Sequence, residues 1–183
     1  MKSSINRLLL VVVFSCTFLI SCTTKNSSEI KDERPLVLTT FTILKDIASN
    51  IAGDRLVVKS ITKPGAEIHS YQFTPSDIVK SKGAKLIIEN GLGLEAWISK
   101  FTSSAGNIPK VKLTDGLTPL MIEDDLYAGK PNPHAWMSPN KAKHYVDKIV
   151  DAFIEIDPNG EDEYIENASS YKAKLSFLDQ ELR

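Results

Sequence analysis

The amino-acid sequence predicts an α/β fold, in which a mostly parallel sheet of four strands is flanked by helices and followed by a long helix. Three observations lead to this prediction. Short runs of β-branched and apolar residues alternate with segments whose apolar residues recur every three or four positions. Strands that alternate with helices form βαβ units, and the strands of such units are parallel. The last segment carries a long apolar stripe, which predicts a helix packed against a partner surface.

The composition is that of an ordinary globular protein. The chain has 183 residues, of which 42% are hydrophobic and 25% charged, and this excludes collagen-like, coiled-coil-only and disordered classes. It carries 22 Lys and Arg against 23 Asp and Glu, a formal net charge of −1. Binding to nucleic acid needs a basic excess that neutralises phosphates, so we expect no nucleic-acid partner.

The N-terminal segment has the features of an export signal. Lys2 and Arg7 precede an apolar run over residues 8–20, which is shorter than the roughly 20 residues of a transmembrane helix but suits the core of a signal peptide. The run ends in Leu-Ile-Ser before Cys22, and this ending resembles the lipobox of bacterial lipoproteins. In those proteins the peptide is cleaved before the cysteine, whose sulfur carries the lipid.

We therefore predict that residues 1–21 are a lipoprotein signal peptide and that Cys22 is the lipidation site. Residues 22–34 are polar and charged, and we interpret them as a flexible tether. Such a protein is anchored to a membrane by its lipid rather than spanning it. An ordinary secretory signal with an incidental cysteine is the alternative.

The first predicted strand–helix unit follows the tether. Residues 36–41 form a β-branched apolar run that predicts a strand. Thr42 can then cap a helix, which Gly53 ends. Residues 55–62 again combine valine and isoleucine, and they predict the second strand.

A strong signal for the start of a helix precedes the third and fourth predicted strands. Residues 74–77, Thr-Pro-Ser-Asp, combine a capping residue, a proline at the first helical position and an acid three residues after the cap, and the short helix ends at Gly83. Residues 84–89 predict a buried third strand and residues 111–113 a short fourth strand. Between them, apolar residues at helical spacing predict another helix: Leu94, Trp97, Ile98 and Phe101.

Two further helices are predicted near the C-terminus. Ser138-Pro139 opens the first, and Asp157-Pro158 opens the second, whose first turn is acidic and so complements the helix dipole. The apolar residues of the second helix repeat in alternating steps of three and four: Tyr164, Ala168, Tyr171, Leu175, Leu178 and Leu182. Residues 114–137 show no period, and an irregular segment of this length usually carries function.

Histidines are the residues most suited to binding chemistry here. His69 and His134 each lie in a loop after a strand, where ligands collect in open α/β sheets. Neutral imidazole is a ligand for manganese, iron, zinc and copper. Two loop histidines at this spacing are also compatible with a purely structural role. His144 lies inside a predicted helix, and we interpret it as a surface or packing residue.

Two other patterns are weaker. Residues 123–125, Glu-Asp-Asp, could supply carboxylates but are also typical of a solvated loop tip. Gly91-Leu-Gly93 lies between a strand and a helix, but it lacks the third glycine of a dinucleotide fingerprint. Ser70 lacks the context of a nucleophile elbow, and there is no His-Glu-x-x-His motif. We therefore expect no catalytic residue and no enzyme activity.

The sequence motifs around the two loop histidines resemble those of a known family. Residues 65–77 (Gly-Ala-Glu-Ile-His-Ser-Tyr-Gln-Phe-Thr-Pro-Ser-Asp) and 130–139 (Lys-Pro-Asn-Pro-His-Ala-Trp-Met-Ser-Pro) closely resemble the metal-receptor lipoproteins of bacterial ABC importers for manganese, iron and zinc. Residues 90–97 and the segment from Asp157 through residues 171–175 look like the same family.

The resemblance implies a receptor of two α/β lobes joined by one long rigid helix, with the metal between the lobes. It makes His69 and His134 the metal ligands of the N-terminal lobe. Residues 35–157 would then form that lobe, and residues 158–183 would begin the inter-lobe linker helix. The family's C-terminal lobe supplies a glutamate and an aspartate, or a third histidine in zinc receptors. It is missing here, so we expect the chain to be a truncated N-terminal portion of a receptor.

The resemblance also implies the cargo and the partners. Residues 70–133 contain no histidine, whereas zinc receptors of the family often carry a histidine-rich loop there. We therefore favour divalent manganese or iron as the transported ion, with zinc as the alternative within the family. The expected partner is a membrane permease, and the expected protein is a monomeric lipoprotein in the periplasm or at the cell surface. An exported metal-dependent hydrolase and a surface adhesin are alternatives from other classes.

Overall fold

The computed structural model describes residues 32–124 and 126–183. The predicted signal peptide, Cys22 and most of the predicted tether lie outside the described residues. No helix within the described part of the chain has the length and apolar character needed to cross a membrane.

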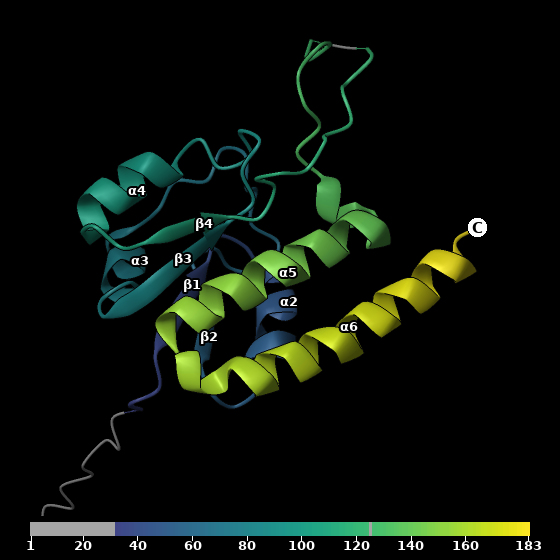
Figure 1. The fold of residues 1–183 in the computed structure, drawn as a ribbon. Coiled ribbons are helices and arrows are strands. Elements are labelled where there is room, and N and C mark those ends of the chain that lie inside the picture. The colour runs from purple at the N-terminus through teal and green to yellow at the C-terminus, as the bar shows by residue number, and fades with distance from the viewer. Residues whose placement is uncertain (1–31, 125) are drawn as a thin grey trace, which may run out of the picture. The chain divides into compact units, whose positions relative to one another are not determined.

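A four-stranded parallel sheet forms the centre of residues 34–183, as predicted (Figure 1). Its strand order is β2-β1-β3-β4, so the chain crosses from one side of β1 to the other between β2 and β3. Val37 of the central strand β1 aligns with Val58 of β2 and with Leu86 of β3. The strands are β1 (Leu36–Thr39), β2 (Val57–Ser60), β3 (Ala84–Glu89) and β4 (Lys110–Lys112).

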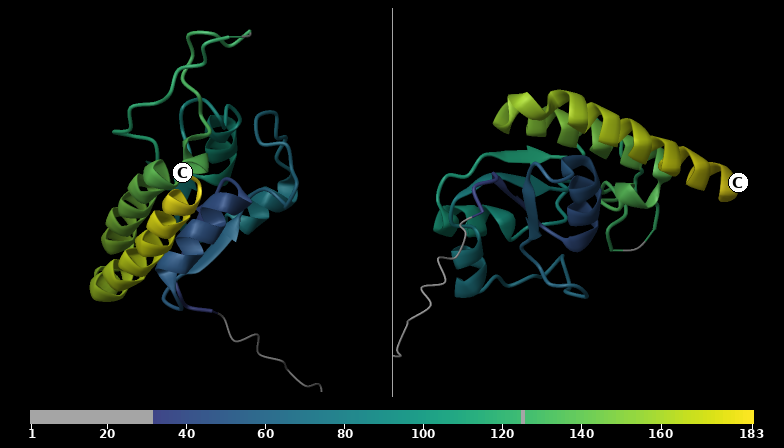
Figure 2. Two further views of the ribbon diagram at one scale, coloured as in Figure 1. Left: turned by 90° about the vertical axis from the view of Figure 1, so that its right-hand side faces the viewer. Right: turned by 90° about the horizontal axis from the view of Figure 1, so that it is seen from below.

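Helices cover both faces of this sheet and create two hydrophobic cores. On one face, α2 (Thr42–Ala52), α5 (Pro139–Ile156) and α6 (Glu161–Glu181) pack against Val37 and Ile88 of the sheet. On the other face, Leu38 and Ile87 pack with residues of α4 (Ile98–Ala105), and α3 (Pro75–Lys80) adds the half-buried Ile78. Figure 2 shows α5 and α6 side by side along one face.

Two predicted helix starts are wrong, for different reasons. The N-cap of α2 is Phe41, not Thr42, and Phe41 has extended backbone and no capping side chain. The helix predicted from Leu94 begins only at Ile98, because the backbone between Gly91 and Gly93 has positive φ angles and holds the chain in turns. By contrast, the start predicted at Thr74 is confirmed, since its amide donates to the Asp77 side chain 2.9 Å away.

The segment between β4 and α5 is folded mostly into turns. A single antiparallel bridge joins Met121 to Pro131, and a 3₁₀ helix (Ala135–Met137) leads into α5. A second 3₁₀ helix (Pro158–Gly160) separates α5 from α6. The Asp-Pro pair therefore opens a 3₁₀ turn first, and α6 begins at Glu161 with three acidic residues in its first turn.

The apolar stripe of α6 is covered along only part of its length. Tyr164 and Ala168 are buried against α5 and α2, and Tyr171 and Leu175 are half-buried on the same core. Leu178 and Leu182 are exposed. The partner surface expected for this stripe is thus supplied by α5 and α2 for the first half of the helix.

A half-buried polar contact joins the turn between α5 and α6 to the segment before β2. The Arg55 guanidinium donates to both carboxylate oxygens of Asp157, at 2.8 and 3.1 Å, and the Tyr164 hydroxyl donates to the same carboxylate at 2.6 Å. The hydrogen bonds from Arg55 and then Tyr164 hold the pKa of Asp157 below its ordinary value.

We expect the substitution Asp157→Asn to lower the free energy of unfolding at neutral pH and to flatten its dependence on pH in the acid range. A carboxyl with a lowered pKa in the folded state stabilises the fold above its unfolded pKa of about 3.9, and this contribution is lost as the pH falls through the folded value. Urea denaturation followed by circular dichroism across that range measures both effects. The exposed Asp151→Asn is the control, and equal effects of the two variants would contradict the prediction.

Candidate metal centre

The structure brings His69 and His134 together at the carboxyl edge of the sheet. Their ring centroids are 5.5 Å apart and the ring planes are inclined by 59°. Metal–imidazole bonds are about 2.1 Å long, so two rings at this separation are close enough to bind one ion. The two side chains come from segments 65 residues apart in the sequence, 69 and 134, and they are adjacent only because the parallel strands end at a common edge.

Asn132 orients the ring of His134. Its side-chain oxygen accepts hydrogen bonds from the backbone amide of His134 at 3.0 Å and from the ring Nδ1 at 2.9 Å. An amide oxygen can only accept, so this contact assigns the proton to Nδ1 and leaves Nε2 with a free lone pair. Fixing the tautomer in this way is what metal-binding histidines require of their neighbours.

Aromatic rings hold His134 from the side of the core. Trp136 packs edge-on against the His134 ring at 5.2 Å, and Phe41 packs against Trp136 at 4.9 Å. Burial lowers the pKa of His134, and the neighbouring His69 ring lowers it further. Both effects keep the His134 imidazole neutral at neutral pH, which is the form that binds a metal.

The loop that carries His69 is pinned at two points beside the ring. The indole Nε1 of Trp97 donates to the carbonyl of Ile68 at 2.9 Å, and the His69 amide donates to the Glu67 carboxylate at 3.0 Å. Tyr71 packs edge-on against the same indole at 5.2 Å. Trp97 therefore supports the His69 loop from both sides of the histidine.

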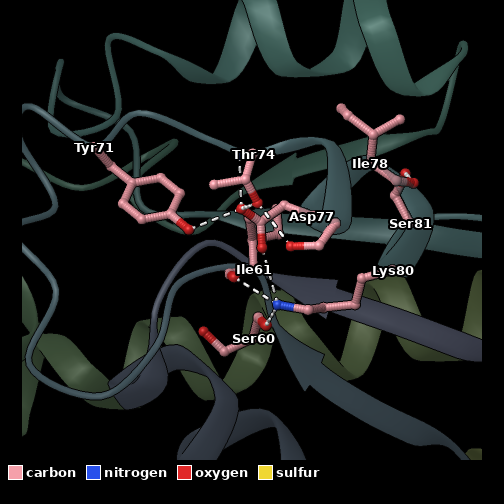
Figure 3. A network of polar contacts seen from close by, with 9 residues as sticks. Ser60, Ile61, Tyr71, Thr74, Asp77, Ile78, Lys80 and Ser81 are labelled. Carbon is pink, nitrogen blue, oxygen red and sulfur yellow. Dashed lines mark hydrogen bonds and ion pairs between the residues drawn. The ribbon is translucent and has the colours of Figure 1, made fainter.

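The far end of this loop is fastened to β2 by a polar network (Figure 3). The Asp77 carboxylate accepts hydrogen bonds from Tyr71, Thr74 and Lys80, and the Lys80 ammonium also donates to the carbonyls of Ser60 and Ile61. Burial alone would raise the pKa of Asp77, but these hydrogen bonds outweigh it and lower the pKa.

Two hollows border this centre, one lined by both imidazoles and the other by His134 alone. The larger, of about 650 Å³, lies between the rings and the loop that follows β4, and the smaller, of about 280 Å³, lies between Leu120 and the start of α5. Within residues 32–124 and 126–183, no three His, Cys, Asp or Glu side chains are grouped so that they could hold a metal ion. The described residues thus offer two nitrogen ligands beside open space.

The other candidate residues lie apart from this centre. His144 is hydrogen-bonded through Nε2 to the carbonyl of Asp115 at 2.9 Å, and it belongs to the surface of α5. Glu123 and Asp124 are exposed in the loop after β4, and Asp125 is outside the described residues.

The backbone at the start of the Gly91–Gly93 turn is hydrogen-bonded to a nearby side chain. The carboxylate of Glu95 accepts from the amides of Asn90 and Gly91 at 2.7 and 3.1 Å, so it fills the cradle that a phosphate would need. This turn therefore holds a side chain of its own chain rather than a nucleotide.

Sequence reasoning did not identify the residues that position the two histidines. Asn132 could have been found, because asparagine side chains often bond to the amide two residues further along, and Asn-Pro-His has that spacing. Asn90 donates to the carbonyl of Pro133 at 2.9 Å, and Trp97 bonds to Ile68. These two contacts join segments far apart in the sequence, so no local sequence pattern predicts them.

Comparisons with known proteins agree on one family. The model of zinc-uptake complex component A, a periplasmic protein, matches residues 37–183. The chain is 47% identical to the iron-binding protein YfeA of Yersinia pestis and 36% identical to the manganese ABC transporter substrate-binding lipoprotein PsaA of Streptococcus pneumoniae, over 94% and 90% of its length. It spans 56% of the length of each of these relatives.

Solved structures show the same relationship. A manganese-bound periplasmic metal-binding protein from Candidatus Liberibacter asiaticus is 36% identical and superposes with a TM-score of 0.68, over 77% of this chain and 53% of that one. Because the family model covers most of the chain and relatives align along nearly all of it, the chain belongs to the zinc-uptake complex component A family of periplasmic metal-binding proteins.

Proposed function

We propose that the chain provides the N-terminal half of the metal site in an extracytoplasmic receptor that delivers divalent manganese or iron to the permease of an ABC importer. The observation that carries this proposal is the pair of facing imidazoles, His69 and His134, with a free Nε2 on His134. The metal is the cargo, and we propose no catalytic step. Captured ions would be bound, shielded from water and passed on.

The two nitrogens are half of a ligand set in this proposal. Manganese and iron take four or more ligands, and carboxylates are preferred by such hard ions over a third imidazole. A glutamate and an aspartate from a second lobe would complete the site, with residues 35–157 as the first lobe and residues 158–183 as the start of the linker. Zinc would bind the same site tightly, so geometry and availability must supply the selectivity.

The names of the relatives support this choice of metal and location. One is named as iron-binding and another as a manganese transporter lipoprotein, although the family model itself is named for zinc. We propose that Cys22 carries the lipid anchor, that residues 1–21 are removed, and that residues 22–34 tether a monomer to the outer side of a membrane.

Paramagnetic broadening tests the site directly. We expect substoichiometric Mn²⁺ to erase the NMR signals of the His69 and His134 rings in the purified chain at a lower Mn²⁺ concentration than it broadens those of the His144 ring. A bound Mn²⁺ ion relaxes nearby nuclei steeply with distance, and His144 is held elsewhere by Asp115. Broadening centred on Glu123 and Asp124, or equal broadening of all three rings, would contradict the assignment.

A further inference from the structure

A third hollow, of about 440 Å³, lies at the end of β2, and neither His69 nor His134 lines it. The end of β2 forms one wall, with Lys59 and Ser60, and the residues after it continue that wall with Thr62 and Lys63. The first turn of α2 forms the opposite wall, with Thr42 and Lys45, and the end of α3 closes one side. Among the residues that the structure describes, no acidic one lines this hollow.

The hollow is positively charged. Lys45, Lys59 and Lys63 are exposed, and their ammonium groups make no hydrogen bond or ion pair with the described residues. Lys80 also lines it, but its ammonium group is already bonded to Asp77 and to two backbone carbonyls. Three lysines with unpaired ammonium groups therefore line one hollow, and no carboxylate of the described residues lines it with them.

The first turn of α2 adds to this charge. Its N-cap, Phe41, supplies no capping side chain, and the turn contains no acidic residue. The free amides at the start of an α-helix carry a partial positive charge and accept anions. In many helices a capping side chain accepts hydrogen bonds from these amides, but α2 has no such cap beside the lysines.

Two hydroxyl groups in the hollow point to a ligand independently of the charges. Thr62 is only 3% exposed, and its hydroxyl makes no hydrogen bond among the described residues. The Ser60 hydroxyl is buried and also has no partner; Figure 3 shows that the Ser60 carbonyl, in contrast, is taken by Lys80. Of the two, the Ser60 hydroxyl is the one buried without a partner among the described residues, and buried polar groups are almost always satisfied, so a polar group bound in the hollow would complete it.

We propose that this hollow binds a phosphate group. A tetrahedral phosphate presents several acceptor oxygens and about two negative charges, which match three ammonium groups, two hydroxyl donors and an open helix N-terminus. The group could come from free inorganic phosphate or from the headgroup of an anionic phospholipid, because both present the same chemistry. The site is independent of metal binding at His69 and His134.

Titration of the purified chain with inorganic phosphate, at constant ionic strength against chloride, tests the site. We expect saturable shifts of the backbone amide signals of Ile43 and Thr62. Flotation with vesicles of phosphatidylglycerol, compared with neutral phosphatidylcholine, tests the lipid source. If phosphate shifts the amide signals but the chain does not float preferentially with phosphatidylglycerol vesicles, the ligand is free phosphate. If the chain floats preferentially with these vesicles and the double variant Lys59→Ala and Lys63→Ala does not, the ligand is the phospholipid headgroup.

The control variants distinguish phosphate binding at the hollow from nonspecific attraction to positive charge anywhere on the chain. We expect the double variant Lys59→Ala and Lys63→Ala to weaken phosphate binding by about tenfold or more, and Thr62→Val to weaken it without any change of charge. Lys85→Ala with Lys100→Ala removes the same charge from two exposed lysines elsewhere and should leave binding unchanged. Equal losses in both double variants, or the absence of saturable binding to phosphate and to anionic vesicles, would overturn the proposal.

Discussion

Replacing His69 and His134 together with alanine is expected to weaken Zn²⁺ binding by at least about 100-fold. Loss of a residue that only orients a ligand already costs about 10–100-fold in affinity, and here both ligands themselves are removed. Zn²⁺ is the sharpest probe because it binds imidazole more tightly than Mn²⁺ or Fe²⁺ does. Competition of the purified chain with a chromophoric chelator measures the change at fixed pH.

The third histidine provides the matched control for this experiment. His144→Ala removes the same chemical group, but its ring bonds to a backbone carbonyl and lies apart from the pair. We expect its Zn²⁺ affinity to stay within about twofold of that of the unmodified chain. If the double variant kept its affinity, or if His144→Ala lost as much, the paired imidazoles would not be the metal site.

The sheet and its flanking helices were predictable because the strands are short and bounded by turn residues, and β1 and β3 are apolar. Residues 84–89 form a strand with the predicted bounds, and Pro139 begins α5 as predicted. The start of α4 was not predictable from periodicity, because Leu94 and Trp97 are buried at helical spacing yet lie in turns. Apolar spacing reports which residues reach the core, and only backbone conformation decides which of them are helical.

The pairing of the two histidines at the candidate metal centre was predictable in part. The order of strands and loops indicates that His69 and His134 meet at one edge of the sheet, and the resemblance to metal receptors names them as ligands. Their support was not predictable, since Trp97 bonds to a residue 29 positions away and Asn90 to one 43 positions away. Such contacts depend on how the loops pack, and a single sequence carries no record of that.

Asn90 links the fold to the candidate metal centre through several hydrogen bonds. It is fully buried at the end of β3, and its side-chain oxygen accepts from the Tyr145 hydroxyl on α5. Its side-chain amide donates to the carbonyl of Pro133, the residue next to His134. Its backbone carbonyl accepts from the Thr114 hydroxyl at 2.6 Å, so four segments meet at one side chain and its peptide group.

We expect Asn90→Ala to lower the free energy of unfolding by about 2–5 kcal/mol and the Zn²⁺ affinity by about 10–100-fold. The substitution leaves the Tyr145 hydroxyl and the Pro133 carbonyl without partners, and each buried orphan costs about 1–3 kcal/mol. Without this hydrogen bond Pro133 is less fixed, and the neighbouring His134 ring can leave its orientation. We expect metal affinity to fall as it does when other residues that orient a ligand are removed. Urea denaturation and chelator competition on the same preparation measure the two effects.

Tyr145→Phe separates the two roles, because it removes one hydrogen bond of Asn90 and keeps the bond to Pro133. We expect this variant to lose about 1–3 kcal/mol of stability and to keep its Zn²⁺ affinity within about twofold. A stability loss shared by both variants, with an affinity loss confined to Asn90→Ala, assigns Asn90 a positioning role at His134. Equal affinity losses in the two variants would show that Asn90 acts on the metal only through the stability of the fold.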